Sequence, residues 1–207
     1  MSYSVAIAHL KQSDPALAVL IDQVGPCHLD QSQHEGDLLY TLARTIIHQQ
    51  LSIKVAATIH RRFLQLYPEK SAPSARDILN ISDDRLRGAG ISRPKIVYLK
   101  DLAQKVEAGI PTLAELERLD NPAIIKTLTQ VKGIGPWSVQ MLLIFRMHRL
   151  NVLPTEDLGV QTGIQKLYGL EERPKKRDVE ALGQKWQPYG AIAAWYLWRS
   201  LDMDVWN

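Results

Sequence analysis

Apolar residues recur at intervals of three and four along most of this 207-residue chain. This spacing restricts the fold more than any other feature, because it places those side chains on one face of a helix. After Asp37, which can cap a helix, the apolar residues are Leu38, Leu39, Leu42, Ile46 and Ile47. Few segments alternate with a period of two residues, the pattern of a half-buried strand. We therefore predict an all-α protein of about ten short helices.

Further helices are predicted over residues 55–66, 74–79, 83–86, 94–106 and 113–119. Asn121 followed by Pro122 predicts another start, because a capping residue precedes a proline that suits the first turn. Thr155 can cap a helix whose first turn would hold Glu156 and Asp157. The polar residues 171–177 predict a connector between helices.

Composition narrows the class of protein. Hydrophobic residues make up 45% and charged residues 23%, as in globular proteins. Cys27 is the only cysteine, which excludes an intrachain disulfide framework, a four-cysteine zinc site and an iron–sulfur cluster held by this chain alone. We expect a cytoplasmic protein without a membrane partner, because no signal-peptide pattern or long apolar run is found. The net charge of +3 permits a nucleic-acid partner without requiring one.

A glycine-rich turn separates two helical patterns. Gly133 and Gly135 flank Ile134, and Pro136 suits the first turn of the following helix. Such a hairpin can point backbone N–H groups at a phosphate, with the charge of Lys132 beside them. An ordinary helix–turn–helix connection explains the glycines equally well. Ile134 favours the hairpin, because an apolar residue at its tip can pack between the two helices.

Acidic and aromatic residues follow the turn. Glu156 and Asp157 stand near a predicted helix start, where the helix dipole favours an ionised carboxylate. Acidic residues are common at helix starts for that reason alone, so this feature has a purely structural explanation as well. Trp195 and Trp198 are three residues apart and would lie near each other on a helix. We interpret Trp186 and Trp195 as core residues.

In this order, the hairpin, the turn and Asp157 resemble the helix-hairpin-helix (HhH-GPD) DNA glycosylase superfamily. Residues 46–52, 86–103 and 186–198 also resemble the corresponding segments of that superfamily. The likeness is greatest to its bacterial 3-methyladenine DNA glycosylase II group, without the N-terminal β-domain of that group. The resemblance implies two helical lobes with a DNA-binding cleft between them. We place the lobes at residues 35–150 and at 1–34 plus 151–207.

The activity that the resemblance implies is excision of alkylated purines, of the 3-methyladenine and 7-methylguanine type, from duplex DNA. Asp157 matches the catalytic aspartate. Relatives that also cut the backbone carry a lysine where this chain has Trp137, so a monofunctional enzyme without lyase activity is expected. It would leave an abasic site for base excision repair. Two alternatives remain open: a glycosylase for a deaminated or mismatched base, and a non-catalytic DNA-binding module.

The resemblance also assigns roles by position. The base pocket would be lined by Trp137, Trp198, Met141 and Gln49. The residues in contact with DNA would be His48, Gln50, Leu51, Lys132, Gly133, Ile134 and Gly135. Backbone carbonyls would hold a monovalent cation, Na⁺ or K⁺, at Thr129, Val131 and Ile134. No other cofactor is expected, and the protein is predicted to act as a monomer on double-stranded DNA at the bacterial nucleoid.

Overall fold

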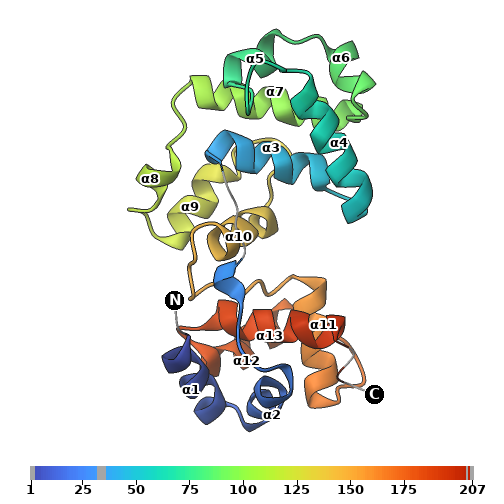
Figure 1. Cartoon of the computed structure of the whole chain (residues 1–207). Helices are drawn as coiled ribbons and strands as arrows, with labels where there is room; N and C mark the ends of the chain where they lie inside the picture. The colour runs from blue at the N-terminus through green and yellow to red at the C-terminus, as the bar shows by residue number, and fades with distance from the viewer. Residues whose placement is uncertain (1–2, 32–35, 204, 206–207) are drawn as a thin grey trace. The chain divides into compact units, whose positions relative to one another are not determined.

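The computed structural model describes residues 3–31, 36–203 and 205 (Figure 1). Within these ranges the secondary structure consists of helices α1 to α13 and two short 3-10 turns, with no strand. The predicted all-α fold is therefore confirmed. Among the described residues, no helix is both long enough and apolar enough to cross a bilayer.

The chain divides into two compact units. The central unit is His34–Val139, and the terminal unit combines Met1–Gln33 with Gln140–Asn207. The first boundary that the sequence predicted, at residues 34 and 35, lies outside the described residues. The second break falls inside helix α10 (Pro136–Phe145), whereas the prediction put it after residue 150. The predicted cleft between the lobes stays a prediction.

The central unit is built around helix α7. Its helices before α10 are α3 (Leu38–His48), α4 (Ile53–Gln65), α5 (Ala75–Asn80), α6 (Asp83–Gly88), α7 (Arg93–Glu107), α8 (Leu113–Leu116) and α9 (Asn121–Leu128). Helix α7 packs against α3, α5 and α6, and α3 also packs against α4. The apolar face predicted for α3 is buried throughout. Asp37 caps that helix as predicted and accepts a 2.8 Å hydrogen bond from the Tyr40 N–H.

The terminal unit joins the two ends of the chain. It contains α1 (Ser4–Ser13), α2 (Pro15–Val24), the turn η1 (Leu29–Gln31), α11 (Leu158–Tyr168), α12 (Lys176–Gly183), the turn η2 (Gln184–Trp186) and α13 (Gly190–Asp202). Helix α13 packs against α11 and α2, so residues near both chain ends share one core. Every residue from Gly190 to Leu197 is buried. This part of the helix therefore has no solvent-exposed face, and its sequence shows no alternation between an apolar and a polar face.

Two predicted boundaries need correction. Helix α9 is capped by Asp120 rather than Asn121, because the Asp120 carboxylate accepts a 2.8 Å hydrogen bond from the Ala123 N–H. The connector predicted over 171–177 ends early, because α12 begins at Lys176. At the start of α12, the Asp178 carboxylate accepts a 2.9 Å hydrogen bond from the N–H of Lys175, the residue before the helix.

A buried carboxylate fastens the terminal unit together. Asp14 is 1% exposed and accepts hydrogen bonds from the Tyr168 hydroxyl and, at 2.7 Å, from the Trp186 indole N–H. The Lys185 ammonium lies 3.1 Å away. Burial opposes ionisation, but the hydrogen bonds outweigh it and lower the pKa of Asp14. Trp186 is fully buried, which confirms its interpretation as a core residue.

Candidate active site

Asp157 is the N-cap of helix α11. Its backbone is extended, and its carboxylate oxygen Oδ1 accepts a 2.8 Å hydrogen bond from the Val160 N–H. The prediction that Thr155 caps this helix, with Asp157 inside the first turn, is therefore wrong. The helix begins two residues later than predicted because the aspartate side chain itself satisfies the first-turn donor. Asp157 thus stands immediately before the helix, at its positive end.

The same oxygen is held by Trp198. The indole N–H of Trp198, on α13, donates to Asp157 Oδ1 over 2.8 Å. Gly159 lies against both groups, and a Cβ atom there would be 2.8 Å from Trp198 Cδ1 and 3.1 Å from Asp157 Oδ1. Phe145 stacks on the indole, with ring centroids 5.6 Å apart and planes 27° from parallel. The carboxylate and the indole therefore form one fixed pair.

Glu156, the acidic neighbour, is placed differently. Its carboxylate lies 3.3 Å from the Lys176 ammonium, and its side chain is 62% exposed. Such an exposed ion pair contributes little to stability and leaves the group in water. Of the two adjacent acids, only Asp157 is joined to the aromatic side chains.

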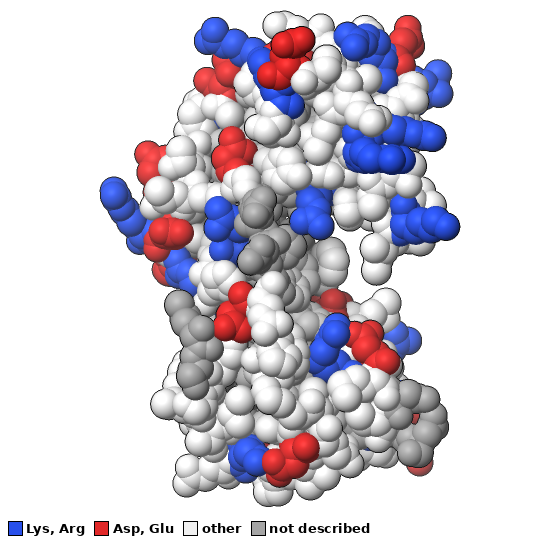
Figure 2. Space-filling view, viewed as in Figure 1, with Lys and Arg blue, Asp and Glu red and all other residues white. Residues whose placement is uncertain are grey.

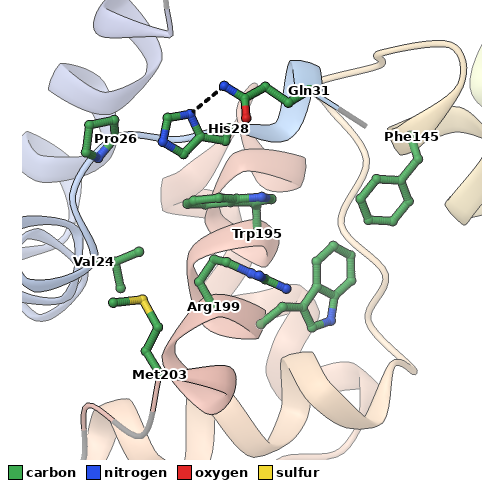
Figure 3. A pocket seen from close by; sticks show the side chains of 9 residues that line it. Val24, Pro26, His28, Gln31, Phe145, Trp195, Arg199 and Met203 are labelled. Atoms are coloured by element: carbon green, nitrogen blue, oxygen red, sulfur yellow. Dashed lines mark hydrogen bonds between the residues drawn. The ribbon is translucent and has the colours of Figure 1, made fainter. Parts of the chain in front are cut away.

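Trp198 is also one wall of a cavity of about 490 Å³ that is lined in part by aromatic side chains. It is lined by Val24, Pro26, His28, Gln31, Phe145, Trp195, Trp198, Arg199 and Met203. Figure 3 shows the Trp195 ring between His28 and Arg199. The Arg199 guanidinium lies 6.0 Å from the centre of the Trp195 ring and also pairs with Asp202. The Gln31 amide nitrogen donates a 3.1 Å hydrogen bond to His28 Nδ1.

The predicted pocket residues are only partly brought together. Trp198 lines the cavity, whereas Trp137, Met141 and Gln49 are not among its described lining residues. Trp137 is 46% exposed at the start of α10. Trp195, interpreted as a core residue, is 9% exposed and is also a wall of the cavity. The base-pocket roles of Trp137, Met141 and Gln49 stay predictions.

Sequence reasoning missed the walls contributed by the N-terminal segment and by α10. His28 and Gln31 belong to no recognisable motif, and Phe145 ends a helix that is apolar on all sides. Arg199 is adjacent to Trp198 in sequence, which is the one signal that could have indicated it. His28, Gln31 and Phe145 reach the cavity only through the packing of segments that are far apart in the sequence.

The hairpin, residues 129–135, has the expected glycine geometry at one of its two glycines. Gly133 has φ +78°, and a Cβ there would lie 2.3 Å from the Tyr98 ring. Gly135 is exposed, and a Cβ there would meet no atom within 4 Å. Ile134 is 4% exposed, as expected for a side chain packed between two helices.

Two hairpin N–H groups already have acceptors. The Lys132 N–H donates to the Asp101 carboxylate over 2.8 Å, and the Ile134 N–H donates to the Val131 carbonyl over 3.0 Å. The carbonyl that accepts the Ile134 N–H belongs to Val131, one of the three residues whose carbonyls were assigned to a monovalent cation. The cation itself stays a prediction.

Residues 49–52 connect α3 to α4 and carry the predicted DNA-inserting side chains; we term them the insertion segment. Gln50 is exposed and has φ +56°, which is uncommon for a residue other than glycine. Leu51 is 37% exposed. The Gln49 amide instead donates a 2.7 Å hydrogen bond to the Gly133 carbonyl. His48 is half-buried, and burial together with Arg44 and Lys95 lowers its pKa.

Comparison with known proteins gives consistent results. A family described as "HhH-GPD superfamily base excision DNA repair protein" matches residues 43–188. DNA-3-methyladenine glycosylase 1 of Schizosaccharomyces pombe is 36% identical over 200 residues, covering 96% of this chain and 88% of the yeast protein. The solved structure of a 3-methyladenine DNA glycosylase from the same yeast, in complex with abasic DNA, has a TM-score of 0.86 at 35% identity and covers 95% of this chain and 96% of that chain. A DNA-3-methyladenine glycosidase of Bacillus halodurans has a TM-score of 0.86 at 33% identity, covering 97% and 91%.

Proposed function

The chain belongs to the HhH-GPD superfamily of base excision DNA repair proteins, and from this premise we propose how it works. It is a monofunctional DNA glycosylase that removes alkylated purines from duplex DNA and leaves an abasic site. The observation that carries the proposal is the hydrogen bond between Trp198 and Asp157. This bond joins the Asp157 carboxylate to Trp198, and the Trp198 ring is itself one wall of the aromatic cavity.

The cavity suits a positively charged heteroaromatic ring. Its volume of about 490 Å³ falls within the range of small-molecule sites. A purine methylated at N3 or N7 carries positive charge, and an aromatic face attracts a desolvated cation by about 2 kcal/mol. A base rotated out of the duplex also needs aromatic surfaces on which to stack. The rings of Trp195 and Trp198 supply such surfaces.

Asp157 would support the bond-breaking step. When the N-glycosidic bond breaks, its electron pair moves to the cationic base and neutralises it, so no general acid is required. Positive charge then grows on the sugar, where a carboxylate stabilises it and orients the attacking water. The Trp198 N–H holds the carboxylate at a fixed point for this purpose. Because position 137 is a tryptophan, no amine is present there to form a Schiff base with the sugar.

The central unit would supply the grip on DNA. Figure 2 shows Lys and Arg side chains gathered over α4 and α6, where the exposed basic residues are Lys54, Arg61, Arg62, Arg85 and Arg87. Contacts to phosphates carry no sequence information and weaken as salt rises, by a slope of about −0.9 per phosphate neutralised. The exposed turn at Gly135 offers a phosphate contact, and Gln50 and Leu51 of the insertion segment enter the minor groove. The protein acts as a monomer, and a cation at the hairpin would steady its carbonyls.

The deciding experiment compares Asp157→Asn with Glu156→Gln. Single-turnover release of 3-methyladenine from duplex DNA should fall about 100-fold or more for Asp157→Asn, because the charge opposite the transition state is lost. Glu156→Gln is the matched control and should be nearly normal, since its carboxylate only pairs with Lys176 at the surface. Equal rates for both variants would remove Asp157 from catalysis.

The substrate class is tested with the wild-type protein on a set of duplexes. Each duplex carries 3-methyladenine, 7-methylguanine, 1,N6-ethenoadenine, hypoxanthine or uracil, and the free base released is measured. Release of the two cationic purines alone is expected. Preferential release of hypoxanthine or uracil would replace the alkylated purine by a deaminated base, and no release from any duplex would leave only a DNA-binding module.

A further inference from the structure

Three polar or aromatic side chains of helix α7 lie on one face. Lys95, Tyr98 and Asp101 are spaced three residues apart, so they are neighbours along the helix surface. None belongs to the hairpin or to the insertion segment, and the proposed chemistry uses none of them. Each nevertheless holds one of those two DNA-contacting segments.

Lys95 fixes the insertion segment. Its ammonium donates to the Ile47 carbonyl over 2.8 Å and to the Gln49 carbonyl over 2.7 Å. These carbonyls stand at the C-terminal end of α3, where the helix leaves acceptors unsatisfied and where a cation is favoured. The next residue, Gln50, has its uncommon positive φ. The lysine therefore holds the backbone immediately N-terminal to Gln50 and Leu51, the side chains expected to enter DNA.

Tyr98 and Asp101 fix the hairpin. The Tyr98 ring lies where a Cβ of residue 133 would be, so it supports Gly133 from behind. The Asp101 carboxylate accepts the Lys132 N–H over 2.8 Å and lies 3.7 Å from the Lys132 ammonium. The Asp101 side chain is only 12% exposed, so this hold is partly shielded from water.

The two held segments are also joined directly. The Gln49 amide donates a 2.7 Å hydrogen bond to the Gly133 carbonyl, which links the insertion segment to the hairpin. With Lys95 bonded to the Gln49 carbonyl, one lysine and one glutamine connect α7, the insertion segment and the hairpin.

We propose that Lys95 is a positioning residue that sets the distance between the hairpin and the insertion segment. The proposal rests on the DNA-repair function above. With this distance fixed, binding of the hairpin to a phosphate delivers Gln50 and Leu51 to the gap left by the displaced base. Without Lys95 the hairpin still binds duplex DNA, but the insertion segment no longer arrives at one fixed place.

The test compares Lys95→Met with Lys100→Met. Lys100 lies on the same helix and donates in the same way to two carbonyls, Leu79 at 2.9 Å and Ile81 at 2.7 Å, at the end of α5 instead of α3. Both variants lose one ammonium and two hydrogen bonds, and Lys100→Met also loses an exposed ion pair with Asp83, 3.6 Å away, which contributes little to stability. They should therefore lower Tm by similar amounts. Any difference in DNA binding between the two variants is then due to the place of Lys95 next to the insertion segment.

The measurement is the ratio of Kd for intact duplex to Kd for the same duplex with a tetrahydrofuran abasic site. Wild-type protein and Lys100→Met should prefer the abasic duplex equally. Lys95→Met should keep its affinity for intact duplex and lose about 10-fold of that preference, with a fall of about 10- to 100-fold in single-turnover excision. Lys95→Arg, which keeps donors for both carbonyls, should recover most of the preference.

Equal preference ratios for Lys95→Met and Lys100→Met would overturn the proposal and leave Lys95 a structural cap. If Lys95→Met does not fold, Gln49→Ala replaces it, and an unchanged ratio there would overturn the proposal as well. The abasic duplex is bound without any chemistry, so the ratio does not depend on turnover. Absence of excision by the wild-type protein would contradict the proposed function alone.

Discussion

Replacing Gly159 with alanine tests whether catalysis requires the present positions of the Asp157 carboxylate and the Trp198 indole. A Cβ at this position would lie 2.8 Å from Trp198 Cδ1, 3.0 Å from Trp198 Nε1 and 3.1 Å from Asp157 Oδ1. Carbon atoms in contact prefer separations of about 3.5–4.0 Å. The indole or the carboxylate must therefore move by roughly 0.7 Å or more. Phe145 is stacked on the indole, so the ring has a neighbour that limits its movement.

The shift should cost more in catalysis than in folding. Overpacking costs about 1–3 kcal/mol, of which about 0.5–1 kcal/mol is offset because alanine favours a helix over glycine. A misplacement of about 1 Å at a catalytic group can cost about 100-fold in rate. We therefore expect Gly159→Ala to remain folded, with Tm lowered by a few degrees, and to excise 3-methyladenine about 10- to 100-fold more slowly.

The assay is single-turnover excision at saturating enzyme, with Tm measured on the same preparation. Gly88→Ala in α6 is the matched control, because no atom lies within 4 Å of its Cβ position and its φ is not positive. That variant should excise at the wild-type rate. A folded Gly159→Ala protein with the wild-type rate would refute the reasoning, since it would show that the pair tolerates displacement.

Three further changes test other parts of the structure. Trp198→Phe keeps an aromatic ring but loses the donor to Asp157; excision should fall about 10-fold or more, because a hydrogen bond to a charged group is worth about 1.5–3 kcal/mol, while Kd for duplex DNA stays constant. Gly133→Ala should lower Tm, owing to the positive φ and the ring behind it, whereas Gly135→Ala should leave Tm unchanged and weaken duplex binding in a filter or fluorescence assay. Asp14→Asn should destabilise the protein by about 1–3 kcal/mol at neutral pH in urea unfolding. Because the folded-state pKa of Asp14 lies below its ordinary value of 3.8, its stabilisation is present above that value and is lost as pH falls through the lowered pKa, so the two proteins should converge in acid.

Local signals in the sequence predicted most of the central unit. Asp37 and Ser74 cap the helices assigned to them, because a short polar side chain before an apolar run has few other uses. The hairpin was found from two glycines around one apolar residue. Its hydrogen bond to α7 was not found, because the acceptor for the Lys132 N–H is Asp101, 31 residues away.

Long-range contacts made the terminal unit harder to predict. Helices α1 and α2 were missed, although Asp14 followed by Pro15 is a helix-start signal. Asp157 was selected by its place in the motif, yet the bond from Trp198 joins residues 41 positions apart and has no local signature. The cavity walls at His28 and Gln31 depend on the packing of α2 against α13, which no local pattern encodes.

The terminal unit is assembled from two segments that are far apart in the sequence, so its parts are synthesised at different times. The carboxylate of Asp14 is synthesised 172 positions before its partner Trp186. The central unit has its whole sequence once residue 139 has emerged, so it can fold while the ribosome is still translating. Helices α1 and α2 can pack against each other early, but the surfaces that contact α13 and the Asp14 carboxylate stay uncovered until the second segment has been made. Helices α1 and α2 are therefore synthesised before the central unit but complete their native contacts after it.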